Sequence, residues 1–301
     1  MEHRCHKTLY IISILKLKKG SISVVLVTLF LSVTLSCRRI RSSHTRNGLI
    51  AEIENAQREN KTSMSSSIWT RGAMELLIPT SPDSFPNQVL KRIAYITSYN
   101  SSTRNPNWVA WHLTAEHSDG AYARPSGNAF HEDEEVSRPR ATLEDYKGSG
   151  WSRGHMCPAG DNKWDADAMY ESFLLTNVCL QDSRLNSGLW NSLEIDCRRW
   201  AKQFGDIYIV CGPVYYRQKH EKIGENNISV PEAFFKIVLC LNGKPKGLGI
   251  VVKNNAGTKK SDLYYNSIDQ VERITGMDFF PGLPDDIENA LESESDINEW
   301  N

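Results

Sequence analysis

One histidine in a glycine-rich stretch is the first candidate for chemistry. The segment GSGWSRGHMCPAGDNKW places Gly148, Gly150 and Gly154 before His155. Glycines permit tight backbone geometry, so this segment can present His155 from a strand into a cleft. A neutral imidazole near pH 7 can accept a proton from water, and Arg153 is a permanent cation that can orient a phosphate or a carboxylate. The tripeptide alone is weak evidence, because a lone histidine is more often structural.

A second group of polar residues follows and suits a metal ion. Asn177 and Asn186 are neutral oxygen donors. Mg²⁺ prefers oxygen ligands and keeps several waters, so one asparagine with phosphate oxygens and water is enough to hold it. The helix expected beyond Asn186 places Trp190, Glu194 and Arg198 at successive i+4 positions on one stripe. The plainer alternative is an amphipathic helix with a surface Glu–Arg pair, which is worth only ~0.3–0.5 kcal/mol.

The two groups together resemble the DNA/RNA non-specific endonucleases, the ββα-metal nuclease family that includes secreted bacterial nucleases and mitochondrial endonuclease G. The family signature is Asp-Arg-Gly-His, then a metal-binding Asn, then a Glu and an Arg along a helix. The run 153–155 matches the signature, Asn186 matches the metal ligand, and Glu194 and Arg198 match the helix positions. Asn177 matches a second family asparagine. Further matches are RNPNWVAWHL, the Arg-Ala-Thr at 140–142, DYKGSG and TGMDFFPGLP, so the resemblance spans about residues 90–284.

The resemblance implies a fold, a cofactor and a mechanism. The fold would be α+β, with a central, mainly antiparallel sheet flanked by helices. Asn186 would hold Mg²⁺, for which Mn²⁺ can substitute, and His155 would activate a water that attacks the phosphodiester of DNA or RNA. Glu194 would orient the water around the metal, and Arg198, Arg153 and Arg124 would neutralise transition-state charge. The products would carry 5′-phosphate and 3′-hydroxyl ends.

Two positions depart from the family pattern. Ser152 stands where the family has Asp, but that Asp is not the metal ligand, so we expect activity to be kept. Arg124 resembles a phosphate-contacting arginine upstream of the histidine, although the loop after it differs in length.

Two other functions compete with an endonuclease. One is a non-catalytic nucleic-acid-binding lipoprotein of the same fold, which the presence of His155 and Asn186 disfavours. The formal net charge of -1 also disfavours it, because passive nucleic-acid binders are usually strongly basic. The other is a metal-dependent phosphodiesterase or phosphatase for small substrates, which would need a closed pocket.

The elements that must position these residues follow from apolar periodicity. Alternating or short apolar runs predict strands, and longer amphipathic runs predict helices. The predicted strands are 92–99, 107–114, 206–212, 233–241 and 248–252; the predicted helices are 165–175, 188–204 and 262–274. The two kinds of element do not alternate regularly, which favours α+β over a doubly wound sheet.

The ends of the chain predict an exported protein. The uncharged run 21–36 follows three lysines and has the length of a signal-peptide core, and Cys37 after Ser36 resembles a lipobox. We therefore expect a lipoprotein-type signal peptide at 1–36, a tether at 37–88, the nuclease domain at 89–284 and a solvated acidic tail at 285–301. The protein would be held at the periplasmic or outer-membrane face by a lipid anchor on Cys37. A plain signal peptide, giving a secreted protein, and an uncleaved membrane anchor are the alternatives.

Five cysteines remain after the leader. No pair has the CxxC spacing of a zinc site, and an odd number leaves at least one thiol unpaired within the chain.

Overall fold

The computed structural model describes residues 78–257, 265–293 and 295–301. The expected signal peptide, Cys37 and most of the expected tether lie outside the described residues. Within the described part of the chain, no helix is long and apolar enough to cross a membrane.

A seven-stranded sheet forms the centre of the domain, and every neighbouring pair of its strands is antiparallel. In spatial order the strands are β1 (Gln88–Lys91), β2 (Ile96–Asn100), β3 (Asn105–Thr114), β6 (Asp206–Val214), β9 (Ala233–Cys240), β10 (Lys246–Lys253) and β11 (Tyr265–Asn266). Buried side chains of β9 alternate between two hydrophobic clusters, with Phe234 and Val238 on one face and Phe235 and Ile237 on the other. Both faces of the sheet are therefore covered by packed side chains.

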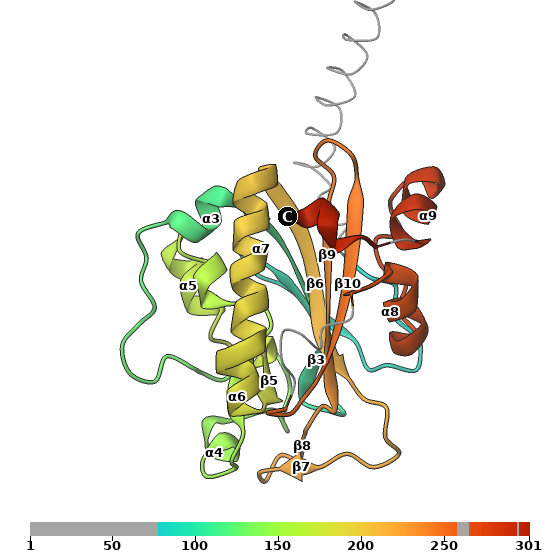
Figure 1. Cartoon of the computed structure of the whole chain (residues 1–301). Helices are drawn as coiled ribbons and strands as arrows, with labels where there is room; N and C mark the ends of the chain where they lie inside the picture. The colour runs from blue at the N-terminus through green and yellow to red at the C-terminus, as the bar shows by residue number, and fades with distance from the viewer. Residues whose placement is uncertain (1–77, 258–264, 294) are drawn as a thin grey trace, which may run out of the picture. The chain divides into compact units, whose positions relative to one another are not determined.

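Helices cover the two faces in separate layers (Figure 1). The long helix α7 (Asn191–Phe204) packs on β3 and β6 through Leu193, Cys197 and Trp200. Helices α8 (Ile268–Thr275) and α9 (Asp285–Ser293) lie on the opposite side, where α8 contacts β10. The mixed α+β architecture with a central antiparallel sheet is confirmed.

A small two-stranded ribbon lies on the face of the sheet that α7 covers, and it leads into that helix. Strands β4 (Ser152–His155) and β5 (Val178–Gln181) pair antiparallel and lead into α6 (Ser183–Leu185), the π-helical segment η4 (Asn186–Trp190) and α7. This order is strand, strand, helix. The remaining elements are α3 (Ala115–Asp119), α4 (Leu143–Tyr146), η2 (Ala159–Asp161), α5 (Ala166–Glu171), η3 (Leu175–Asn177), β7 (Lys222–Ile223), β8 (Ile228–Ser229) and η6 (Ile297–Trp300).

The expectation of a solvated acidic tail is wrong. The tail forms α9 and η6, and Trp300 is fully buried against Trp200 and Phe204, with ring centroids 4.9 and 5.8 Å apart. The tail also forms an ion pair with the turn between β9 and β10, where the Lys244 ammonium lies 2.6 Å from the Glu299 carboxylate. One large apolar side chain therefore outweighs the charged composition of the segment.

The last part of the expected tether is also folded against the domain. Ile78 and Phe85 pack against the cluster on the α8 face, and Thr80 and Asp278 exchange backbone hydrogen bonds of 2.9 and 3.0 Å. The prediction of low order is therefore wrong for residues 78–88. The cysteines Cys157, Cys179, Cys197, Cys211 and Cys240 are all unpaired and buried.

Candidate active site

His155 ends β4 and is held between two phenylalanine rings. Its backbone pairs with Val178 of β5, and its ring centroid lies 4.9 Å from that of Phe130 and 5.0 Å from that of Phe173. Only 9% of the residue is exposed, and Nε2 has no hydrogen-bond partner in the described structure. Burial, together with the nearby cations Arg124 and Arg153, lowers the pKa of His155 to about 3. The imidazole is therefore neutral and able to accept a proton.

Strand alternation and one close contact set the positions of the residues around His155. Arg153 and His155 lie on the same side of β4 and line the cavity, whereas Ser152 does not line it. A Cβ atom at Gly154 would lie 2.2 Å from Oε1 of Gln181 on β5, so only glycine lets the two strands approach this closely. The glycine before the histidine thus sets the position of the imidazole.

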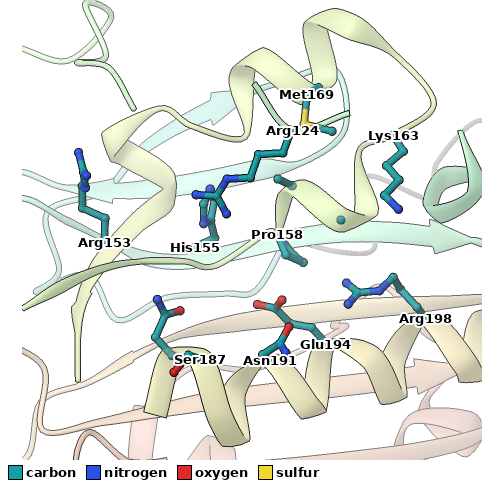
Figure 2. A pocket seen from close by; sticks show the side chains of 13 residues that line it. Arg124, Arg153, His155, Pro158, Lys163, Met169, Ser187, Asn191, Glu194 and Arg198 are labelled. Carbon is teal, nitrogen blue, oxygen red and sulfur yellow. The ribbon is translucent and has the colours of Figure 1, made fainter. Parts of the chain in front are cut away.

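Two arginines stand over the phenylalanine rings beside His155. The Arg153 guanidinium lies 4.5 Å from the Phe130 ring centroid and donates a 2.7 Å hydrogen bond to Asn128 Oδ1. The Arg124 guanidinium lies 5.2 Å from the Phe173 centroid. These cation–π contacts hold both charges on the side of the cavity where Figure 2 shows His155.

The opposite wall of the cavity is the helix that starts after β5. Asp182 caps it by accepting hydrogen bonds from the backbone N–H groups of Arg184 and Leu185. Asn186 begins the π-helical segment, and its side-chain amide has no hydrogen-bond partner among the described residues. π-Helical turns are often found at functional sites, because they reorient side chains within a continuous helix.

Glu194 and Arg198 extend this wall along α7, and Figure 2 shows Glu194 directed across the cavity. Burial raises the pKa of Glu194 to about 7, although the cations Lys236, Arg198 and Arg124 oppose the shift. Arg198 donates a 2.8 Å hydrogen bond to Asp161, which is almost fully buried. The guanidinium is thereby held at the cavity edge in one orientation.

The cavity of about 510 Å³ brings together six of the seven predicted site residues. Its polar lining is dominated by cations, with Glu194 the one carboxylate among the lining residues. The full lining is Arg124, Arg153, His155, Pro158, Ala159, Gly160, Lys163, Met169, Asn186, Ser187, Asn191, Glu194 and Arg198. A chain of net charge -1 thus concentrates positive charge in one hollow, which is the environment that a phosphate needs.

Asn177 is the predicted site residue that does not reach the cavity. It is fully buried, donates to the carbonyls of Cys157 and Ser172 at 2.8 Å, and accepts from the Cys157 N–H at 2.9 Å. All its hydrogen-bonding groups are used within the fold. It fastens the turn that follows His155, so the structure gives it a positioning role and not a catalytic one.

Lys163 and Phe173 belong to the surroundings of this cavity, and the sequence did not predict them. Lys163 lines the cavity, and Phe173 contacts both His155 and Arg124. Lys163 stands in the same polar segment as His155, so its charge was a usable signal. Nothing in the apolar run around Phe173 distinguishes it from an ordinary core residue.

The donor atoms in the cavity fit a hard divalent cation. Among the described residues, no three His, Cys, Asp or Glu side chains converge on a metal position. The cavity instead offers the unpaired amide of Asn186 and the unpaired carboxylate of Glu194. Such a sparse oxygen set suits Mg²⁺, which retains most of its own waters.

Comparisons with known proteins identify the family of the chain. The profile of the family described as DNA/RNA non-specific endonuclease matches residues 73–286. The chain belongs to this family. It is 37% identical over 203 residues to the mouse protein named nuclease EXOG, mitochondrial, a match that covers 62% of this chain and 55% of the relative. The chain thus spans little more than half the length of that relative.

Other members of the DNA/RNA non-specific endonuclease family give the same result. The human protein named endonuclease G, mitochondrial, is 32% identical over 210 residues, covering 65% of this chain and 70% of the relative. A solved structure of the EndoG/EndoGI complex matches with a TM-score of 0.62 and 30% identity, covering 71% of this chain and 92% of the other. The predicted family and the ββα-metal nuclease fold are therefore confirmed.

The prediction of an exported lipoprotein is wrong. The similar nucleases from mouse, human and yeast are named as mitochondrial proteins, and this contradicts a periplasmic, outer-membrane or secreted location. The error came from the apolar run 21–36 and Cys37, which a lipoprotein leader and other kinds of leader can share.

Proposed function

We propose that the chain is a divalent-metal-dependent endonuclease that hydrolyses DNA and RNA with little sequence preference and leaves 5′-phosphate ends. The observation that carries this proposal is the pairing of neutral His155 on one wall of the cavity with Glu194 on the other, within a ring of cations. A proton acceptor, a carboxylate and phosphate-binding charges are the groups that phosphodiester hydrolysis requires.

In the proposed reaction, Arg124, Arg153 and Arg198 bind the scissile phosphate and oppose the negative charge that grows on it. His155 accepts the proton of the attacking water on its neutral imidazole, which lines the cavity. Asn186 would hold Mg²⁺ or Mn²⁺ through its amide oxygen, and Glu194 would orient the surrounding water. The bound cation would supply Lewis acidity at the phosphate and stabilise charge on the leaving oxygen.

Substrate binding also makes His155 a stronger base. The two arginines depress its pKa in the free protein, and a phosphodiester between them neutralises part of their charge. The pKa of His155 then rises towards the working pH, where a general base acts best. Because the cavity offers cations and few groups placed to read base edges, contacts to phosphate explain weak sequence preference.

The test is incubation of the purified protein with supercoiled plasmid, single-stranded DNA and RNA, with Mg²⁺ and with excess EDTA. We expect degradation of all three with Mg²⁺, no cleavage with EDTA, and products that polynucleotide kinase labels only after phosphatase treatment. Undiminished cleavage in EDTA would contradict metal dependence. Binding without cleavage in Mg²⁺ or Mn²⁺ would favour the non-catalytic binder.

Two variants separate the roles of the cavity walls. His155→Asn removes the base and is expected to lower kcat by ~10² to 10⁴ at every Mg²⁺ concentration. Asn186→Ala is expected to weaken Mg²⁺ binding, so that a higher Mg²⁺ concentration is needed and restores part of the rate. Ser183→Ala, an exposed change on the same helix outside the cavity, serves as the control. Wild-type turnover in His155→Asn would refute the assignment.

We also propose a mitochondrial location. Besides the names of the relatives, the first part of the chain supports it: residues 3–51 contain Arg and Lys but no Asp or Glu. Basic segments without acidic residues are typical of mitochondrial transit peptides. A fusion of residues 1–77 to a fluorescent protein should co-localise with mitochondria, and diffuse or secreted fluorescence would contradict the proposal.

A further inference from the structure

Lys236 is a fully buried lysine in the middle of the central sheet. It lies on β9, pairs in register with Cys211 of β6 and Ile250 of β10, and has no exposed surface. Its ammonium has no hydrogen-bond partner in the described structure. A buried cation without such partners is costly, by several kcal/mol. The fold therefore needs another interaction that offsets the cost of burying this charge.

Two tryptophans enclose the ammonium. Nζ lies 4.5 Å from the ring centroid of Trp190 and 5.1 Å from that of Trp111. Both rings are almost completely buried, so the cation–π attraction acts without solvent screening. Lys236 thereby fixes the planes of two indole rings that come from different elements, β3 and η4.

Each tryptophan connects the lysine to a different wall of the active site. The indole N–H of Trp190 donates to the backbone carbonyl of His155 at 3.3 Å. The indole N–H of Trp111 donates to Asp161 at 3.1 Å, and Asp161 in turn accepts the 2.8 Å hydrogen bond from Arg198. Two short chains of contact thus lead from one buried cation to the base and to a phosphate-binding arginine.

The charged groups around Lys236 also belong to the active site. The groups that interact with it are Asp161 of η2, Glu194 and Cys197 of α7 and Cys211 of β6, and Arg198 of α7 faces the same carboxylates. Asp161 is already paired with Arg198, whereas Glu194 has no ion pair among the described residues. Lys236 lowers the pKa of both carboxylates, and they support its charged form although burial opposes it.

We propose that Lys236 is a positioning residue of the active site: its buried ammonium is the countercharge for Glu194 and, through Trp111 and Trp190, fixes Arg198 and His155 on opposite walls. This inference rests on the proposed nuclease function for its catalytic consequence, but its geometric content does not depend on activity. Removal of a group that orients catalytic residues without touching the substrate commonly changes activity or metal affinity by ~10- to 100-fold.

The test is the variant Lys236→Met, which keeps the length of the side chain and removes the charge. We expect kcat for plasmid nicking in Mg²⁺ to fall by roughly 10- to 100-fold while KM for DNA changes less than about threefold. Val238→Ala is the matched control, because it lies on the same face of the same strand and contacts the same core. It should lower the melting temperature and leave kcat unchanged. A Lys236→Met protein with wild-type kcat overturns the proposal.

A double-mutant cycle tests the coupling to Glu194. If Lys236 acts as its countercharge, Lys236→Met should lower kcat by a smaller factor in a Glu194→Gln background than in the wild-type background, and the remaining loss is the part that acts through Trp111 and Trp190. Equal losses in both backgrounds overturn that coupling. If Lys236→Met alone does not fold, the double variant should regain the folded state, because it removes the cation and the carboxylate together; continued failure to fold overturns the proposal.

A metal-free crystal structure of Lys236→Met gives a readout that does not need activity. We expect Trp111 or Trp190 to rotate and its hydrogen bond to Asp161 or His155 to break. Both rings unmoved would overturn the positioning role. A wild-type protein that cleaves no nucleic acid would instead refute the proposed function, and the crystal structure would still decide the role of Lys236.

Discussion

His155 and Glu194 face one another with pKa values displaced in opposite directions. Burial beside two arginines lowers the pKa of His155 to about 3, and burial near an acidic group raises that of Glu194 to about 7. One cavity therefore keeps a base unprotonated and a carboxyl group near its titration point. Separation of pKa values by environment is how enzymes assign different roles to neighbouring groups.

At this scale we predict that Arg153→Gln raises the pKa of His155. Arg153 is one of the two cations that depress it, so its loss should move the value from about 3 upward, short of the ordinary 6.5. NMR titration of the His155 ring protons measures the shift. Lys163→Gln is the control, because Lys163 lines the cavity but is not among the groups that shift His155. An unchanged pKa in Arg153→Gln would show that burial and Arg124 set it without Arg153.

The lowered pKa of His155 also affects the free energy of unfolding in acid. Between pH 6.5 and about 3 the unfolded chain binds a proton on His155 that the folded chain does not, so acidification lowers the free energy of unfolding through this window. The raised pKa of Glu194 acts with the opposite sign, from about 7 down to 4.5. In Arg153→Gln the pKa of His155 in the folded protein lies closer to 6.5, so a narrower pH range separates the folded and unfolded values. Urea unfolding should therefore show a smaller loss of unfolding free energy between pH 6.5 and 4 than in wild type.

Residue types and spacing, together with the resemblance to the family, predicted most of the site residues that line the cavity. His155, Asn186, Glu194 and Arg198 occur in motif order, and the structure brings them together. Asn177 shows the limit, because an asparagine beside a catalytic histidine can serve the metal or the backbone, and only the hydrogen bonds decide. Lys236 lies far away in sequence within an apolar run, so no local pattern connects it to the site.

At the scale of elements, one interrupted helix carries the metal-side wall. The chain runs from α6 through the π-helical segment into α7, so Asn186 and Glu194 belong to one rigid support. The predicted helix 188–204 identified most of it, because its apolar stripe is regular. The prediction missed the first turn, whose signal is the cap at Asp182 and not hydrophobic periodicity.

A glycine inside this support allows a test of its rigidity. A Cβ atom added at Gly188 would meet nothing within 4 Å, so Gly188→Ala removes backbone freedom without a clash. We expect the free energy of unfolding to rise by about 0.5–1 kcal/mol, with kcat unchanged. Gly205→Ala at the end of α7 is the contrasting control, since its φ of +94° should make alanine destabilising. Denaturant unfolding measures both, and a less stable Gly188→Ala would contradict the prediction.

Short elements were the ones that sequence patterns could not resolve. Of the predicted strand 92–99, only the part from Ile96 onward is a strand, β2, and residues 92–95 form the connection from β1. The predicted helix 262–274 begins later, at Ile268, after the short strand β11. Two-residue strands carry no periodicity, and their pairing depends on partners that are distant in sequence.

At the scale of the whole molecule, charge is sorted between surfaces. The active-site cavity collects cations, while acidic residues gather in the C-terminal segment, where the Glu299 carboxylate pairs with Lys244 and the Glu299 backbone carbonyl accepts a hydrogen bond from Lys246. A net charge of -1 therefore conceals a local electropositive site. Overall composition disfavoured a passive basic binder but could not show where the positive charge lies.

The C-terminal segment also closes the core at the end of α7, and this gives the last prediction. Trp300 is fully buried against Trp200 and Phe204, and the Lys246 ammonium lies 3.4 Å from the Phe204 ring centroid. Trp300→Ala should therefore lower the free energy of unfolding by roughly 3–5 kcal/mol. Loss of the exposed salt bridge in Glu299→Gln should lower it by less than about 1 kcal/mol.

Activity should respond differently from stability in this variant. The cavity-lining residues of α7 end at Arg198, before Trp200, so kcat of the folded Trp300→Ala protein at low temperature should equal that of wild type. Thermal melting and plasmid nicking on the same preparation check both statements. An unchanged melting temperature would mean that the acidic segment detaches in solution, as its composition first indicated. A stable protein with reduced kcat would instead show that the segment acts on the active site through α7.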